Sequence, residues 1–117
     1  MTSDPRIPVT ILTEADALPD WLSAAGPAAL VTDATRPAPG PIATERFDAR
    51  PLHRFGCTCC AGRSAAAIAL DRLFQGRARG RTPWFDRVAV SGSDAAREQV
   101  AAALREDALT LARFRNA

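Results

Sequence analysis

The sequence predicts an α/β domain in which helices flank a parallel sheet. Short apolar runs rich in β-branched residues are typical of strands buried on both faces. These runs alternate with segments of helical pattern, which is the order of elements in a layered α/β fold. The 117 residues, 47% of them hydrophobic, suit one core. We therefore expect a single domain over residues 1–117.

The first half of the chain supplies two of these strands. Residues 7–13 form an apolar, β-branched run that predicts strand one. Residues 16–25 predict a modest helix, with a proline tolerated in its first turn and Gly26 as its stop. Residues 28–32 predict the second strand. The prolines of residues 33–41 predict a loop.

The second half of the chain continues the alternation. The pattern of residues 42–55 is weak, and we expect a third strand that ends near its last residue. Residues 61–74 predict the clearest helix, with Gly76 as its C-terminal stop. Residues 85–90 predict another strand. A helix over residues 94–111 follows, because its large apolar side chains fall on one face.

The charge of the chain is balanced but its basic residues are of one type. Arginine supplies all 15 basic residues against 13 acidic ones, and the net charge of +2 creates no global field for nucleic acid or a membrane surface. No apolar run has the length of a membrane span or signal peptide, so we expect a cytoplasmic protein. A P-loop of the usual type requires a lysine, and the chain has none.

All three cysteines lie in one short segment, residues 56–60. In a reducing compartment the spacing C-x-C-C indicates metal binding or thiol chemistry rather than a disulfide framework. Cys57, Cys59 and Cys60 are suitable ligands for zinc, cobalt or copper(I). His53 is a candidate fourth ligand, as is a water or a partner's side chain. Redox chemistry and an inherited turn without metal remain alternatives.

The surroundings of the cysteines favour the thiolate form. The cluster directly precedes the predicted helix over residues 61–74, whose amino end is electropositive. Arg54 and Arg63 add positive charge on either side. Catalysis by a cysteine would need a neighbouring base, and His53, the sole histidine, lies in a run of weak pattern, so we expect no defined Cys–His dyad. Because the motifs for nucleotide hydrolysis described below are also missing, we expect no enzymatic activity.

Two further segments carry polar residues of possible functional use. A basic stretch can meet phosphate, RNA or an acidic partner, although such a run is usually a solvated face and we predict no nucleic-acid binding. The turn at residues 91–94 has the composition of an anion site, but we favour an ordinary helix cap by Ser93 or Asp94. The basic stretch comprises Arg72, Arg77, Arg79, Arg81 and Arg87, with Trp84 and Phe85 close by.

Lined up in order, these segments resemble the CobW family of metallochaperone GTPases along nearly the whole chain. Residues 7–13 are similar to the strand that leads into that family's P-loop. Residues 56–60 match its G-C-x-C-C metal motif, with Arg63 at the position of a frequent arginine. Residues 85–90 resemble the strand before its E-T-x-G motif, and residues 103–115 the helical stretch that follows.

The departures from the family pattern concern nucleotide binding. Residues 14–21 replace the glycine-rich loop, and Asp20 stands about where the lysine would be. Only Ser91 and Gly92 remain near the position of E-T-x-G. The resemblance therefore implies a P-loop-NTPase-like half-domain without a functional P-loop, and no bound nucleotide.

The function expected from the residues and the resemblance together is metal handling. The primary hypothesis is a small non-catalytic protein that binds zinc, or a similar ion such as cobalt or copper, for metal homeostasis or delivery. The alternative is a pseudo-subunit that pairs with a complete CobW-like GTPase, or a homo-oligomer. A weaker alternative is a residual GTP-binding protein. Neither nucleic acid nor a membrane is expected as a partner.

Overall fold

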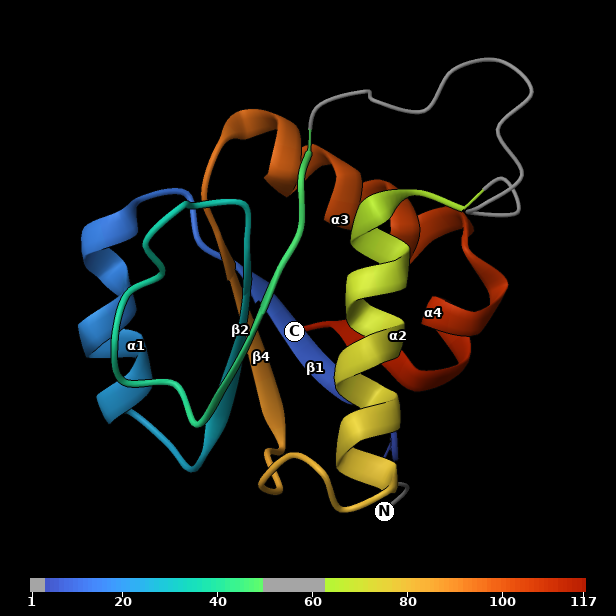
Figure 1. Ribbon diagram of the computed structural model, residues 1–117, viewed down its shortest axis with the longest axis horizontal. Coiled ribbons are helices and arrows are strands. Elements are labelled where there is room, and N and C mark those ends of the chain that lie inside the picture. Colours follow the sequence, from blue (N-terminus) through green and yellow to red (C-terminus); the bar gives the residue numbers. More distant parts are fainter. Residues whose placement is uncertain (1–3, 50–62) are drawn as a thin grey trace.

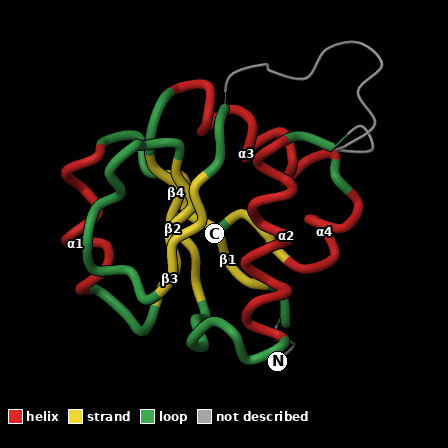
Figure 2. Tube along the Cα trace, in the orientation of Figure 1, coloured by secondary structure: helices red, strands yellow, loops and turns green. Residues whose placement is uncertain are grey.

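The computed structural model of the protein describes residues 4–49 and 63–117. Its centre is a five-stranded sheet in the order β3-β2-β4-β1-β5, in which every neighbouring pair is parallel (Figure 1, Figure 2). The predicted parallel α/β sheet is confirmed. The strands are β1 (Ile7–Ile11), β2 (Ala28–Thr32), β3 (Ala43–Arg46), β4 (Arg87–Ser91) and β5 (Phe114–Asn116).

Helices cover both faces of the sheet. The connection from β1 to β2 crosses the sheet in one direction, whereas those from β3 to β4 and from β4 to β5 cross it in the other. Right-handed crossovers in opposite directions place their helices on opposite faces, and Figure 2 shows α1 on one side and α2, α3 and α4 on the other. The helices are η1 (Ala15–Ala17), α1 (Leu18–Ser23), α2 (Ala65–Ala78), α3 (Asp94–Glu106) and α4 (Ala108–Arg113).

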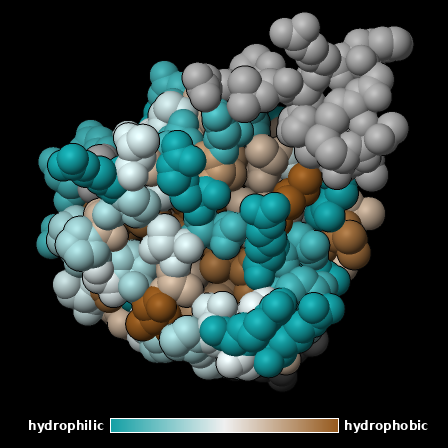
Figure 3. All heavy atoms as spheres, viewed as in Figure 1, coloured by the Kyte–Doolittle hydropathy of each residue, from teal (hydrophilic) through white to brown (hydrophobic). Residues whose placement is uncertain are grey.

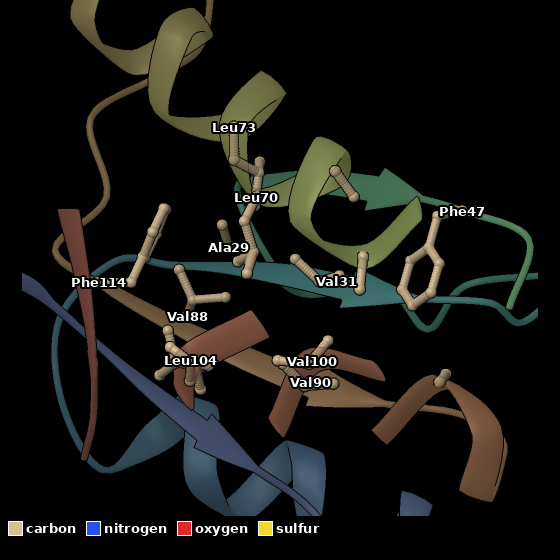
Figure 4. Packing of buried hydrophobic residues seen from close by; sticks show 14 of the residues in the cluster. Ala29, Val31, Phe47, Leu70, Leu73, Val88, Val90, Val100, Leu104 and Phe114 are labelled. Carbon is tan, nitrogen blue, oxygen red and sulfur yellow. The ribbon is translucent and has the colours of Figure 1, made fainter. Parts of the chain in front are cut away.

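The larger part of the core lies between the sheet and the helices α2 and α3. Figure 4 shows Leu70 of α2 and Val100 of α3 directed toward Val88 and Val90 of β4, and all four are fully buried. Burial of one such side chain contributes about 1.5–3 kcal/mol. The opposite face of the sheet carries a smaller cluster, in which Leu30 of β2 packs with residues of α1.

Three of the predicted strands occur close to their predicted places, and the one predicted over residues 85–90 is β4, Arg87–Ser91. Residues 28–32 form β2 as predicted, whereas β1 ends two residues earlier than expected, at Ile11. The third strand ends at Arg46, far before the predicted end, because the chain then turns inward and buries Phe47 and Ala49.

The predicted helix over residues 16–25 is replaced by the short η1 and by α1. The carboxyl end of α1 is hydrogen-bonded by a side chain from a distant part of the sequence. Arg87 at the start of β4 donates hydrogen bonds to the carbonyl oxygens of Trp21, Leu22 and Gly26, at 2.8–2.9 Å. Its guanidinium also stacks on the Trp21 ring, 4.0 Å from the centroid. These bonds add donors at the carboxyl end of the helix, where the Trp21 carbonyl oxygen also accepts a hydrogen bond from the amide of Ala24 at 3.3 Å.

The helix predicted to stop at Gly76 continues through it. A Cβ atom on Gly76 would lie 2.4 Å from Oγ1 of Thr82, so glycine permits close packing of the following loop rather than ending the helix. The chain leaves α2 at Arg79 and reverses at Gly80, whose φ is 73°. At its other end α2 begins at Ala65, not directly after the cysteines, with Ser64 as N-cap.

The predicted helix over residues 94–111 is two helices, and its tail is a strand. Asp107 ends α3 and caps α4, because its side chain accepts hydrogen bonds from Thr110. The resemblance implies a helical stretch up to residue 115, but Phe114–Asn116 form β5, which pairs with β1 and buries Phe114. Within the described part of the chain, no helix has both the length and the apolar character needed to cross a membrane.

Candidate functional site at the carboxyl edge of the sheet

The four predicted metal ligands lie outside the described residues. Cys57, Cys59, Cys60 and His53 belong to the segment 50–62, and the structure describes the two residues that border it, Ala49 and Arg63. Among residues 4–49 and 63–117, no three His, Cys, Asp or Glu side chains gather closely enough to hold a metal ion. The described part of the candidate site therefore consists of the surroundings of these two border residues.

Both borders lie at the carboxyl edge of the parallel sheet. Ala49 follows β3, and Arg63 precedes α2, which runs from that edge back to the amino edge (Figure 1). Helix α3 begins at the same edge, directly after β4. In open parallel α/β sheets, ligands bind outside the carboxyl ends of the strands. The borders of the cysteine segment are thus at the edge where such folds carry their sites.

The Ala49 border is attached to the middle of α3. Ala49 is buried, and its carbonyl oxygen accepts a hydrogen bond from Nε2 of Gln99. The other amide atom of Gln99, Oε1, is buried and has no hydrogen-bond donor in the described parts of the chain. The Gln99 side chain therefore attaches this border to α3.

The Arg63 border is attached to the end of α3 by a paired contact. Nε and Nη2 of Arg63 donate to the two carboxylate oxygens of Asp107, at 3.1 and 3.0 Å, and the side chains are 23% and 17% exposed. Nη1 lies 3.9 Å from Oδ2 of Asp71 on α2. The hydrogen bonds to Asp107 raise the pKa of Arg63. Two parallel bonds fix the plane of the guanidinium as well as its position.

Asp107 joins three parts of the structure through one carboxylate. Its Oδ2 accepts from the backbone and the hydroxyl of Thr110, at 3.0 and 2.9 Å, in addition to its bonds with Arg63. The Arg63 bond, followed by those from Thr110, holds the pKa of Asp107 at about 2, below the usual 3.8, against the opposing effect of desolvation. The carboxylate is therefore charged over the whole physiological range.

A small cavity opens beside this contact. Its volume is 280 Å³, and its polar lining consists of Arg63, Ser64, Glu106 and Asp107, with the alanines of α3 as its wall. Ser64 also caps α2, since its hydroxyl oxygen accepts a hydrogen bond from the amide of Ala67 at 3.1 Å. The hydroxyl oxygen of Ser64 thus serves as an uncharged acceptor at the amino end of α2. Ser64 also lies between the cysteine segment and the first residue of the helix.

The amino end of α3 is occupied by a carboxylate of the chain itself. Asp33, directly after β2, accepts hydrogen bonds from the backbone N–H of Ser93 at 2.9 Å and from its hydroxyl. Partial desolvation raises the pKa of Asp33, but the Ser93 bonds outweigh it and lower the pKa overall. Ser93 is the N-cap of α3, as predicted. A Cβ on Gly92, whose φ is 124°, would lie 2.3 Å from Oδ1 of Asp33.

The turn after β1 carries exposed acidic side chains. Glu14, Asp16 and Asp20 are all exposed, and they occupy the stretch that would be the phosphate loop in the resembled family. The backbone there forms η1, with the Ala17 amide bonded to the Glu14 carbonyl oxygen at 3.1 Å. This turn therefore presents negative charge at the carboxyl edge.

The contacts that organise this edge have no signal in the local sequence pattern. The resemblance places Arg63 beside the metal motif, but its pairing with Asp107 is not predicted from it, and Asp33 lies in a predicted loop. The composition of Asp107 followed by Ala-Leu-Thr, which suits an N-cap, is the one signal available for the break between α3 and α4. Comparison of the chain with family models, characterised proteins and solved structures gave no match.

Proposed function

We propose that the chain binds a transition-metal ion through Cys57, Cys59 and Cys60, with His53 as a candidate fourth ligand. The ion is zinc or a similar one such as cobalt or copper, and the role is metal homeostasis or delivery in the cytoplasm, without catalysis. The observation that carries the proposal is the concentration of every thiol of the chain in the spacing C-x-C-C. Thiolate ligands suit these metals.

The borders of the segment support this proposal. Ala49 and Arg63 are both attached to α3, at Gln99 and at Asp107, and these residues are about 12 Å apart along the helix axis. A segment whose borders are fixed loses less entropy when it closes around an ion than a free chain would. The fold therefore offers a stable base for a metal-binding loop at its carboxyl edge.

Two features favour a function without nucleotide. The acidic side chains Glu14, Asp16 and Asp20 would repel a triphosphate after β1. Asp33 already fills the amino end of α3, where a phosphate would otherwise find backbone donors. The ancestry that we propose is accordingly CobW-like, with the metal motif kept and the phosphate loop lost.

The test is metal binding by the reduced protein and its cysteine variants. We expect about one metal ion per chain by elemental analysis, and a cobalt-loaded form with the absorption bands of thiolate coordination. Cys57→Ser, Cys59→Ser and Cys60→Ser should each abolish tight binding in competition with a chromogenic chelator. His53→Ala tests the fourth ligand.

Thr58→Ala provides the matched control, because Thr58 lies between the cysteines and its hydroxyl is no ligand for these metals. It should retain the affinity of the unaltered chain. A metal-free protein that does not compete with the chelator, or equal binding by the serine variants, would contradict the proposal.

A further inference from the structure

The loop between α2 and β4 carries a second surface, at the amino edge of the sheet and away from the cysteine segment's borders (Figure 1). It contains Arg79 and Arg81 of the predicted basic stretch, whose other arginines lie in α2 and at the start of β4. Three arginines of that stretch have partners within the chain: Arg72 pairs with Glu45 at 3.5 Å, Nε of Arg77 donates to the Phe85 carbonyl oxygen at 2.7 Å, and Arg87 closes α1. These three therefore serve the fold.

Arg79 and Arg81 differ from them. Both are exposed, and neither forms an ion pair with any residue in the ranges 4–49 and 63–117. Trp84 follows in the same loop with 61% of its surface exposed, the largest exposure among the large hydrophobic side chains described. The guanidinium carbon of Arg77 lies 3.5 Å from the centroid of the Trp84 ring and holds the ring in place. Figure 3 shows mainly hydrophilic colours over this end of α2.

The loop that carries these side chains is fixed on the end of α2. The amides of Arg79 and Gly80 donate to the carbonyl oxygens of Gln75 and Arg77, at 3.0 and 3.3 Å. Those of Arg81 and Thr82 both donate to Gly76, at 2.9 and 3.1 Å. A partner that binds here needs to order little backbone, which favours affinity.

We propose that Arg79, Arg81 and Trp84 form a docking surface for an acidic segment of a partner protein. Two guanidinium groups without internal carboxylates are suited to pair with Asp or Glu side chains, and Trp and Arg dominate the energetics of protein interfaces. One exposed ring and two exposed arginines are too few for nucleic acid, which is bound through many phosphate contacts and several stacked bases. This proposal is independent of metal binding.

The test uses fluorescence anisotropy with a labelled poly-glutamate peptide and, separately, a labelled polythymidine oligonucleotide. We expect the peptide to bind, and increasing salt to weaken the binding. Arg79→Glu and Arg81→Glu should each reduce the affinity roughly five-fold, and Trp84→Ala roughly ten-fold. Arg36→Glu is the matched control, because Arg36 is an exposed arginine in another loop, and this change should alter the affinity less than about two-fold.

All four side chains protrude from the fold, so circular dichroism of each variant should match that of the unaltered chain. The proposal is overturned if the peptide does not bind, if Arg36→Glu weakens binding as much as the two loop reversals, or if the oligonucleotide binds more tightly than the peptide.

Discussion

The carboxylate of Asp107 should contribute a measurable and pH-dependent part of the stability. Asp107→Asn keeps the size of the side chain and a good N-cap residue but removes the charge that faces Arg63. The pKa of Asp107 is about 2 in the folded chain, against 3.8 ordinarily. At 1.36 kcal/mol per pKa unit, the difference of about 1.8 corresponds to about 2 kcal/mol of stability at neutral pH.

The sign of the pH dependence follows from the lowered pKa. The stabilisation is complete above 3.8, where the carboxylate is charged in both states, and it is lost as the pH falls toward about 2. The free energy of unfolding of the variant should therefore lie about 2 kcal/mol below that of the unaltered chain at neutral pH, with a melting temperature lower by roughly 8 °C. The gap should close in strong acid.

The assay is urea unfolding followed by circular dichroism, at neutral pH and in steps down to about pH 2. Glu98→Gln is the control, since its pair with Arg105 spans 3.5 Å and both side chains are more than half exposed. That change should cost less than about 0.5 kcal/mol. Equal losses in the two variants, or a gap for Asp107→Asn that does not close in acid, would refute the reasoning.

Three glycine substitutions test the close packing around loops. Gly92→Ala should destabilise the fold by about 2–3 kcal/mol, because φ is 124° and the Cβ would displace Asp33 from the end of α3; Gly80→Ala, with φ of 73° and open space, should cost only about 1 kcal/mol in the same urea assay. Equal costs would contradict the steric argument. Gly76→Ala should lower stability by about 1–2 kcal/mol although alanine favours helix, since its Cβ meets Thr82. A double-mutant cycle with Thr82→Ala should recover most of that loss, and an unchanged loss in that background would exclude Thr82 as the cause.

The parts of the fold that were predictable are those decided by local hydrophobic pattern. The run of residues 28–32 is buried on both faces, so its apolar composition predicted β2 correctly. The three-residue strand β5 was not predicted, because Phe114 is the one buried residue of this strand and lies between two arginines in the sequence. The predicted stop at Gly76 is wrong because the sequence does not show that Thr82 packs against this glycine.

For the candidate site, the sequence predicts the type of ligand chemistry but not the contacts that surround the cysteine segment. The spacing of the cysteines predicts metal binding from the residues alone, and that remains a prediction. The pairing of Arg63 with Asp107 joins positions 44 residues apart. A contact between such distant positions leaves no periodic pattern in the sequence. It depends on how α2 and α3 pack against each other, so no local pattern predicts it.

The contact of Arg87 with the end of α1 also bears on the order in which the chain acquires structure. The acceptor carbonyls of Trp21 and Gly26 lie 61–66 residues before their donor. During synthesis from the amino terminus, α1 and its loop are made long before Arg87 emerges. The hydrogen bonds from Arg87 to the end of α1 cannot form until β4 enters the sheet. Loop closure over such separations slows folding, so we expect α1 to become protected late, together with β4, rather than as an early local helix.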